Sequence, residues 1–453
     1  MKARAGPALL LTLGALAASC AGLGPAPGPR APAPVAGAPP STGRPRGPGA
    51  AQAPLRLDRE PALDIGLAWD LDSLGLDPRG PAVLTRESGG ASDLIHAAAS
   101  LLSIRRLPDG LEVRWDGGRN ARALGRADTL LVRGEHTPGA EDLLRIRWNG
   151  KTWRAPFKVF VNPRGKLTLA ARLPLETYLL GVVPGEIGAL SESLLEAGRA
   201  QAIAARSYTL FYRGRRGDEG FDLYGTVEDQ LYGPVESERP LATRCVETTR
   251  GRIALSGGQA IRANYCSTCG GITAEVWEAW PAAPIPYLVS HPDHGSGDYC
   301  MASPQYRWRE EWRAAEFTGN LARFGPPQGV PLSAGGVGEL VDVRVLARSR
   351  SGRVWRLEIS TTTGAIVVPA YVLRQVLRRP GMPAAILRSN LFKVDVRRDP
   401  ATRRALGVVV SGAGSGHGVG LCQTGSLGMA RAGSSAEQIL AHYYPGIEIR
   451  RFY

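Results

Sequence analysis

The residue with the clearest chemical potential is Glu186, which follows the apolar run Val182-Val-Pro-Gly185. An apolar setting disfavours the charged form of a carboxyl group, so it raises the pKa and keeps the proton available near neutral pH. Such a group can act as a general acid. The structural alternative is a carboxylate that accepts hydrogen bonds from backbone N–H groups at the start of the helix predicted after it. The sequence thus nominates Glu186 as a proton donor.

A polar segment, Asp229-Gln-Leu-Tyr-Gly233, follows downstream. Asp229 is the nearby acid that could serve as a second carboxylate, and we interpret it as structural or substrate-orienting rather than as a nucleophile. Gln230 and Tyr232 can hydrogen-bond hydroxyl and amide groups of a ligand. Packing of a turn is the alternative for both.

Arg199 and Arg206 lie seven positions apart, which is about two turns of a helix, so both can point in one direction. Guanidinium groups in that arrangement could hold a carboxylate of a substrate. An internal ion pair is the competing explanation for Arg206.

Two further segments carry polar candidates. Gly412–Gly425 lacks the Gly-Lys-Ser/Thr ending of a nucleotide-binding loop, but its glycines permit close approach of a ligand. Within it, His417 could donate to a ligand oxygen or stabilise charge, unless it bonds its own turn, and Gln423 is a further ligand-binding candidate. Cys422 and His417 could also be interpreted as a catalytic cysteine and its base, but the sequence offers no third group to orient the histidine. In the other segment, a strand end and Gly-Gly turn, the candidates for lining the cleft are Tyr265, Ser267 and Thr268.

These residues need a scaffold of strands and helices. Short alternating runs such as 111–115, 143–148 and 158–161, separated by Asp-Gly, Asn-Gly and Pro-Arg-Gly turns, predict hairpins. Helical spacing over 191–212, with Ser191 as cap, predicts a helix that flanks the site, and a last helix is expected over 435–443. Downstream strands are expected at 252–255, 341–346, 355–359 and 406–410. The fold class is therefore α+β and rich in strands.

The 453 residues are 43% hydrophobic and 21% charged, which excludes a wholly disordered chain. The formal net charge of +14 comes from 55 Lys and Arg against 41 Asp and Glu, yet these basic residues are scattered and form no run interleaved with aromatics. We therefore expect no nucleic-acid partner.

The N-terminus predicts export. Residues 1–19 combine Lys2 and Arg4 with an apolar stretch and end before Cys20, which is typical of a lipoprotein signal peptide. An ordinary signal peptide is the alternative. Residues 20–54 are rich in Pro, Gly and Ala and predict a disordered tether, with a reach of roughly 100 Å at about 3.1 Å per residue. The expected location is the cell envelope, with the protein held on a membrane by a lipid at Cys20.

The remaining cysteines suit an exported protein with one disulfide, for which Cys269 and Cys300 are the preferred pair. We expect no cofactor. The alternative is zinc, because the spacing of His291, His294 and Cys300, together with Cys266 or Cys269, could hold that ion. Cys266 and Cys269 also form a Cys-x-x-Cys pair, but the surrounding sequence lacks a thioredoxin-like pattern.

Taken in order, several segments closely resemble the stage II sporulation protein D (SpoIID/LytB) family, from about residue 62 to the C-terminus. They are Leu173–Ile187, Arg199–Tyr208, Asp229–Gly233, Tyr265–Thr273, Gly412–Gly425 and His442–Gly446. Members of that family cleave peptidoglycan glycan strands as lytic transglycosylases or act as enhancers of cell-wall amidases. The resemblance implies a SpoIID-like catalytic region at 161–453, after a β-rich region at 55–160.

By this resemblance, Glu186 is the catalytic acid. It would protonate the oxygen that links N-acetylmuramic acid to N-acetylglucosamine, and would then act as base on the muramoyl 6-hydroxyl to give a 1,6-anhydro product. Three departures stand out: Arg199 replaces a usual Lys, Cys422 replaces a usual Ser, and 224–229 lacks the His and Cys of the zinc site that some members carry.

Two functions stay open at this point. The first is a lytic transglycosylase that acts on peptidoglycan glycan strands. The second is a non-catalytic peptidoglycan-binding enhancer of a cell-wall amidase, which would then be a partner. A thiol enzyme that uses the Cys-x-x-Cys pair is a weaker alternative.

Overall fold

The computed structural model describes residues 54–78, 82–95, 101–134, 145–154 and 156–453. Strands are more common than helices in these ranges, so the predicted strand-rich α+β class is confirmed. The predicted signal peptide, Cys20 and all of the predicted tether except Pro54 lie outside the described residues. Among the helices of the described ranges, none has the length and apolar character needed to cross a bilayer.

The N-terminal part consists of two sheets that share one core, with strand orders β13-β1-β12-β11-β8-β3-β4 and β2-β5-β6-β7. Alternate side chains point inward, as Leu111 and Val113 do in β6 and Leu130 and Val132 do in β8. The strands of the first sheet are β1 (Ala62–Leu71), β3 (Ala82–Ser88), β4 (Ala91–Leu94), β8 (Thr129–Gly134), β11 (Phe157–Val161), β12 (Leu167–Pro174) and β13 (Leu223–Tyr224). Those of the second are β2 (Ser73–Leu76), β5 (Leu102–Leu107), β6 (Gly110–Trp115) and β7 (Asn120–Gly125).

The Asn-Gly turn predicted from the sequence connects two strands of a hairpin in this part. Strands β9 (Arg145–Trp148) and β10 (Lys151–Arg154) pair antiparallel across the two residues Asn149 and Gly150. Both have positive φ, 50° and 72°, as the favoured two-residue hairpin turn requires. The predicted strands in this part therefore form close to the expected positions.

A group of helices adjoins the first sheet. Helix α2 (Leu195–Tyr212) packs against α1 (Leu175–Ile187), α3 (Pro240–Thr248), α6 (Gln423–Arg431) and α7 (Ala436–Tyr443). Close approach depends on small residues: a Cβ on Gly198 of α2 would lie 2.6 Å from the sulfur of Cys245 in α3. The helix expected over 435–443 is confirmed as α7, which Ser435 caps together with Gln438.

The helix boundaries around Glu186 differ from those expected. The segment before Glu186 is itself helical, because Leu175, Tyr178, Leu179, Val182 and Val183 bury one face of α1 at helical spacing. Glu186 therefore lies in the last turn of α1 and not at the start of a helix. The next α-helix begins at Leu195 after a short 3₁₀ turn, and the Ser191 side chain does not cap that turn.

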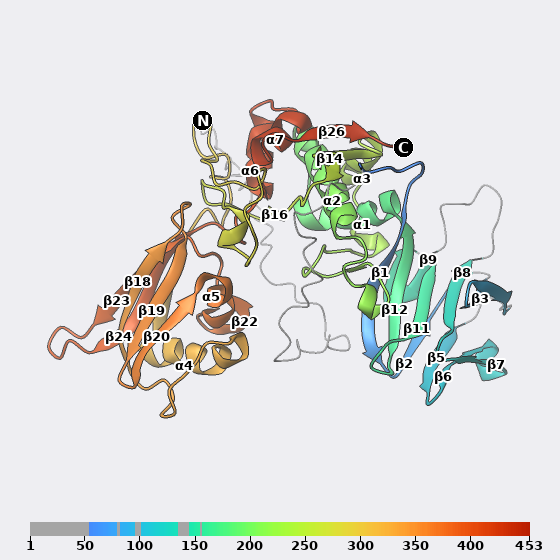
Figure 1. The fold of residues 1–453 in the computed structure, drawn as a ribbon, viewed down its shortest axis with the longest axis horizontal. Coiled ribbons are helices and arrows are strands. Elements are labelled where there is room, and N and C mark those ends of the chain that lie inside the picture. The colour runs from blue at the N-terminus through green and yellow to red at the C-terminus, as the bar shows by residue number, and fades with distance from the viewer. Residues whose placement is uncertain (1–53, 79–81, 96–100, 135–144, 155) are drawn as a thin grey trace, which may run out of the picture.

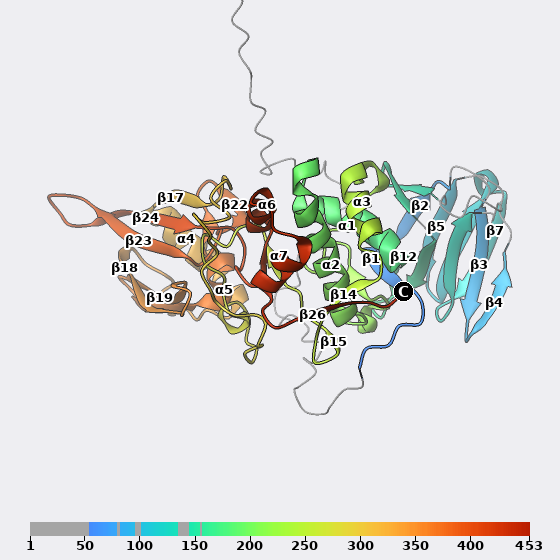
Figure 2. The same cartoon turned by 90° about the horizontal axis from the view of Figure 1, so that it is seen from above.

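Residues 307–413 form a second unit with its own core, built around Trp312, Phe317, Leu357 and Val408. This unit lies within the region 161–453, which was predicted as one catalytic region. Figures 1 and 2 show this unit and the N-terminal sheets at opposite ends of the molecule, with α1, α2 and α3 between them. Its strands are β17 (Arg307–Arg313), β18 (Leu340–Arg348), β19 (Val354–Thr361), β20 (Gly364–Pro369), β21 (Arg378–Arg379), β22 (Met382–Ile386), β23 (Phe392–Arg398) and β24 (Ala405–Ala413), and its helices are α4 (Ala314–Phe324) and α5 (Ala370–Val376).

The chain segments on either side of the second unit come together in the middle of the molecule. Strand β16 (Tyr265–Cys266), which precedes the unit, pairs in parallel with β25 (Leu421–Cys422), which follows it. The C-terminal strand β26 (Glu448–Arg451) adds to β14 (Arg252–Ser256), whose other neighbour is β15 (Gln259–Ala260). The β16–β25 pair brings the Tyr265 and Gln423 segments side by side.

Candidate functional site

The carboxylate of Glu186 lies where three separate chain segments meet. Its Oε1 accepts a hydrogen bond of 3.0 Å from the backbone N–H of Leu231, and its Oε2 accepts one of 3.2 Å from the side-chain amide of Gln423. The Glu186 side chain is partly exposed. The structure thus fixes this carboxylate with two donors while leaving it open to solvent, and therefore to a ligand.

The pKa of Glu186 lies above its ordinary value. Burial by its surroundings raises it, whereas hydrogen bonds from the Leu231 N–H, the Gln423 amide and Tyr265 act in the opposite direction. No second carboxylate in the described part of the chain is among the groups that shift this pKa. The group is therefore better suited to hold a proton near neutral pH than an ordinary glutamate is.

Gln230 holds the side chain of Tyr265 through a hydrogen bond and does not itself face solvent. Its Oε1 accepts a hydrogen bond of 2.9 Å from the Tyr265 hydroxyl, and its Nε2 donates to Thr209 Oγ1 at 2.7 Å. Gln230 is completely buried, so the expectation that it contacts substrate is wrong. Its role is to fix the Tyr265 hydroxyl near Glu186.

Asp229 and Tyr232 also have structural positions. The Asp229 carboxylate, which is buried, pairs with Arg216 at 3.0 Å and with Arg215 at 3.3 Å, and accepts the N–H of Tyr224. Tyr232 is buried among aromatic rings and lies against Gly181 of α1. The predicted substrate contacts of Asp229 and Tyr232 are therefore corrected to loop anchoring and core packing.

Arg206 is the internal ion pair that the sequence left as an alternative. Its Nε and Nη2 donate to the two oxygens of Glu176 at 2.9 and 2.6 Å, and the Arg206 side chain has no exposed surface. Burial alone would raise the pKa of Glu176, but the hydrogen bonds and charge of Arg206, with Gly251 and Tyr453, outweigh it and lower the pKa. Arg206 cannot reach a substrate, so its predicted binding role is wrong.

Arg199 lies on the same helix but is partly exposed. It forms an ion pair with Glu196 of its own helix and donates to Thr248 Oγ1 of α3 at 3.3 Å. These contacts lie along the α2–α3 packing. A role in substrate binding stays a prediction for this residue.

His417 bonds its own turn, as the alternative reading of it proposed. Its Nδ1 accepts the N–H of Val419 at 3.0 Å, and its ring packs on that of Trp280 with centroids 4.7 Å apart. Burial, followed by the charges of Arg374, Arg353 and Arg262, lowers the pKa of His417 to about 3. The imidazole is therefore neutral at physiological pH and cannot stabilise charge as a cation.

Ser267 and Thr268 differ in exposure. Ser267 is exposed, and its carbonyl oxygen accepts hydrogen bonds from both the N–H and the hydroxyl of Thr424, the residue after Gln423. Thr268 is buried, with its hydroxyl 2.8 Å from that of Ser303. Ser267 stays a candidate for ligand contact beside Gln423, whereas Thr268 is corrected to a packing residue.

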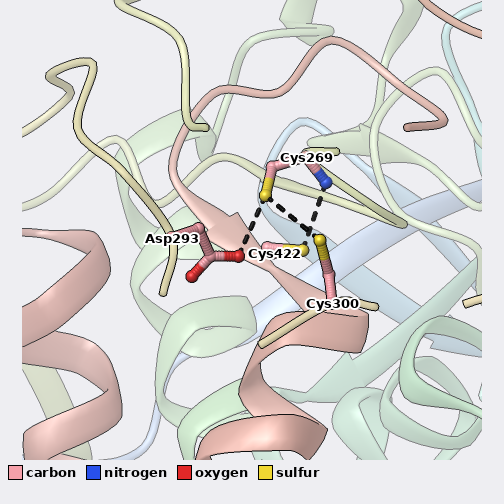
Figure 3. Close-up of side chains that lie close together, drawn as sticks. All are labelled: Cys269, Asp293, Cys300 and Cys422. Carbon is pink, nitrogen blue, oxygen red and sulfur yellow. Dashed lines mark hydrogen bonds between the residues drawn. The ribbon is translucent and has the colours of Figure 1, made fainter. Parts of the chain in front are cut away.

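The cysteines do not form the expected disulfide. Cys269 and Cys300 are free thiols whose sulfurs lie 3.7 Å apart, and Cys422 and Asp293 adjoin them (Figure 3). The zinc ligands considered from the sequence are not brought together as a set, because His294 is exposed and Cys266 is not part of this cluster.

One donor to Glu186 and one residue of the cysteine cluster were not predicted from the sequence. The Leu231 N–H that bonds Glu186 is a backbone donor, so no side-chain type could reveal it. Asp293 was missed although it lies between His291 and His294, two residues whose spacing could hold a metal ion. An acid between two histidines was a usable signal.

One segment of the chain is similar to a known protein family. Residues 163–255, which contain Glu186 and Gln230, match the model described as Stage II sporulation protein, SpoIID. This part of the chain is similar to the SpoIID family. The resemblance seen in the sequence is thereby confirmed. A second model, described as a domain of unknown function, matches residues 296–420 and so covers the second unit beyond that segment.

The similarity to curated proteins extends beyond that match. A stage II sporulation protein D of Bacillus subtilis is 28% identical over 292 residues, which cover 61% of this chain and 74% of that protein. An uncharacterized protein of Brachyspira hyodysenteriae is 27% identical over 293 residues, 64% of this chain and 70% of the relative. An amidase enhancer of Bacillus subtilis is 26% identical over 314 residues, 60% of this chain but 40% of its own length.

Proposed function

We propose that this protein is a peptidoglycan lytic transglycosylase that cleaves the bond between N-acetylmuramic acid and N-acetylglucosamine and leaves a 1,6-anhydro end. The observation that carries the proposal is the state of Glu186, a partly exposed carboxyl group with a raised pKa and two fixed donors in the segment similar to the SpoIID family. Such a group can give up a proton and later accept one.

Glu186 alone can serve both halves of this reaction. In the first half its proton passes to the glycosidic oxygen, and the bond from that oxygen to C1 of the muramoyl sugar breaks. In the second half the 6-hydroxyl of the same sugar bonds to C1 while Glu186 takes the hydroxyl proton. No water is consumed, and the carboxyl group ends in its starting state. The Leu231 N–H and the Gln423 amide stabilise the carboxylate between the two halves.

The surroundings of Glu186 favour this single-carboxylate route over hydrolysis. Hydrolytic glycosidases use a second carboxylate, about 5 to 10 Å from the first, as nucleophile or as base for water. Asp229, the acid that the sequence offered for this role, is held by Arg216 and Arg215. The Asp229 carboxylate is buried, and its two oxygens already accept hydrogen bonds from these arginines and from the Tyr224 N–H.

The proposed location of the protein is the cell envelope. The sequence of residues 1–54 supports export, lipid attachment at Cys20 and a tether that lets the folded part reach the peptidoglycan. Glycan strands are the proposed substrate, and a membrane is the proposed anchor.

The experiment uses the full chain with Cys20→Ser, which keeps it soluble, incubated with intact and with peptide-stripped peptidoglycan. We expect anhydro-muramoyl products from the active protein and a loss of about a hundredfold to ten-thousandfold in Glu186→Gln, the range that a general acid–base group typically contributes. The matched control is Glu437→Gln. The Glu437 carboxylate pairs with Arg252 on the surface, so this variant should keep full activity. Absence of product from the active protein on both substrates would refute the proposal.

A second candidate function is stimulation of a cell-wall amidase without catalysis, which the similarity to an amidase enhancer favours. It predicts that Glu186→Gln binds sacculi and stimulates an amidase as well as the unchanged protein does. The transglycosylase proposal predicts binding without turnover in that variant.

A further inference from the structure

Three cysteines and one aspartate form a compact buried cluster away from Glu186. Cys269, Asp293, Cys300 and Cys422 each offer one ligand atom, and these four atoms all lie within 4.8 Å of one another (Figure 3). The Cys269 thiol donates to Oδ2 of Asp293 at 2.9 Å, and its sulfur lies 3.7 Å from that of Cys300. All four side chains are buried.

The spacing of the sulfurs matches a tetrahedral metal site. Zinc binds thiolate sulfur at about 2.3 Å, so two sulfurs on one tetrahedral ion lie about 3.8 Å apart. Cys269 and Cys300 are 3.7 Å apart. A disulfide could use only two of the three sulfurs, and would leave a thiol and a carboxylate buried beside it.

The groups around the cluster orient its ligand atoms. The other carboxylate oxygen of Asp293, Oδ1, accepts the Tyr443 hydroxyl at 2.8 Å and lies 3.1 Å from Nε2 of His442. The Cys422 sulfur accepts the backbone N–H groups of Cys269 and Gly425, each at 3.2 Å. Outer hydrogen bonds of this kind fix the ligands of metal sites and stabilise thiolates.

The charge of the surroundings suits an anionic centre. The buried guanidinium of Arg353 donates through Nη2 to the Cys269 carbonyl at 2.9 Å, and its Nε has no hydrogen-bond partner among the described residues. Three thiolates and a carboxylate around a divalent ion carry a formal charge of −2. A buried cation next to that charge offsets part of the cost of burying it.

We propose that Cys269, Asp293, Cys300 and Cys422 bind a structural zinc ion. Four protein ligands with no exposed surface make a closed site, and thiolates with a carboxylate favour zinc over hard cations such as magnesium or calcium. This site differs from the zinc site of His and Cys that some members of the SpoIID family carry just before the segment of Gln230, because residues 224–229 contribute no ligand to it.

The position of the site indicates a structural role for the zinc ion. Cys300 precedes the second unit, Cys422 follows it, and Cys269 lies on the turn after β16. One ion would therefore link the chain segment that enters the second unit to the segment that leaves it. Cys422 also caps α6, whose first residue is Gln423, so the ion would hold the residue that bonds Glu186.

The test measures metal and not glycan cleavage, so its outcome is independent of the proposed function. The full chain with Cys20→Ser is expressed with zinc in the medium and purified without chelator or reductant. Zinc per chain is measured by mass spectrometry of the elements, and free thiols are titrated after unfolding with and without chelator. We expect one zinc per chain and Cys269, Cys300 and Cys422 all reduced.

The variants are Cys300→Ser and Asp293→Asn, which should lose the zinc, and Cys245→Ser, a buried free thiol in α3 that should keep it. Should the first two fail to fold, the absorption spectrum of the unmutated protein loaded with cobalt(II) decides, because tetrahedral thiolate ligation gives intense visible and near-ultraviolet bands. Zinc-free protein with a disulfide, zinc-free reduced protein that takes up neither metal, or zinc retained in a folded Cys300→Ser variant would each overturn the proposal.

Discussion

The side-chain amide of Gln423 donates to Oε2 of Glu186 at 3.2 Å, although the two residues lie 237 positions apart in the sequence. The second unit and the loops that flank it are inserted between them. The parallel pairing of β16 with β25 closes this separation and places the first residue of α6 beside the last turn of α1. Glu186 is thus positioned by a long-range contact and not by its own helix alone.

Replacing Gln423 should change the pH dependence of glycan cleavage. The Gln423 amide lowers the pKa of Glu186, so Gln423→Met raises it further. Because the protonated form is the active acid, activity falls as pH rises through this pKa, and the alkaline limb of kcat/KM should move to higher pH. Loss of one hydrogen bond to a charged group also predicts about a tenfold lower kcat/KM at neutral pH. An unchanged alkaline limb would show that Gln423 does not act on the proton of Glu186.

Replacing Tyr265 should affect both stability and pH dependence. Tyr265→Phe leaves the buried Oε1 of Gln230 without its donor, which costs about 1 to 3 kcal/mol in the free energy of unfolding. Tyr265 also lowers the pKa of Glu186, so the alkaline limb should again move upward. Thermal unfolding and a pH–rate profile of the same preparation check the two effects. Tyr299→Phe, whose hydroxyl bonds none of these groups, should leave the alkaline limb unchanged.

Asp229 should prove dispensable for the chemistry. Asp229→Asn breaks a buried ion pair with Arg216 and is expected to destabilise the fold by about 3 kcal/mol. At a temperature where the variant is folded, kcat should fall less than about tenfold, because the Asp229 carboxylate is buried and paired with Arg215 and Arg216. A loss as large as that of Glu186→Gln in folded protein would instead make Asp229 a second catalytic acid.

The Arg206–Glu176 pair should give the fold an acid-sensitive component. The pKa of Glu176 is lowered in the folded state, so its contribution to stability is present above the unfolded pKa of about 4.3 and is lost as pH falls through the folded value. Glu176→Gln should therefore cost about 3 to 5 kcal/mol at neutral pH and flatten the decline of stability in acid. Denaturant unfolding across pH measures this. Glu339→Gln, which breaks an exposed pair with Arg404, should cost under about 1 kcal/mol.

Local patterns predicted much of the fold and the centre of the site. Alternating runs and an Asn-Gly turn located β6, β9 and β11, and a capping pair located α7. Glu186 and Gln423 were both nominated from their segments. The whole of α1 was missed, because Pro184 and Gly185 indicate a helix boundary, whereas the structure places them in the last turn of that helix.

Side-chain partners far apart in the sequence escaped prediction. Arg206 was proposed to bind a substrate carboxylate, yet its carboxylate is Glu176, 30 positions earlier and brought close by the packing of α1 on α2. The cluster of Cys269, Asp293, Cys300 and Cys422 joins residues up to 153 positions apart, so spacing could not assemble the full set. The separate core of the second unit is a set of contacts between residues far apart in the sequence, so local patterns did not reveal it.

The most direct test of the central claim is cleavage of glycan strands in water labelled with heavy oxygen, by the unchanged protein and by Glu186→Gln, with mass spectrometry of the new ends. Attack by the sugar's own 6-hydroxyl predicts anhydro ends without label from the unchanged protein, and no new ends from the variant. Labelled reducing ends, or anhydro ends made equally well by Glu186→Gln, would contradict the account in which Glu186 is the single acid and base.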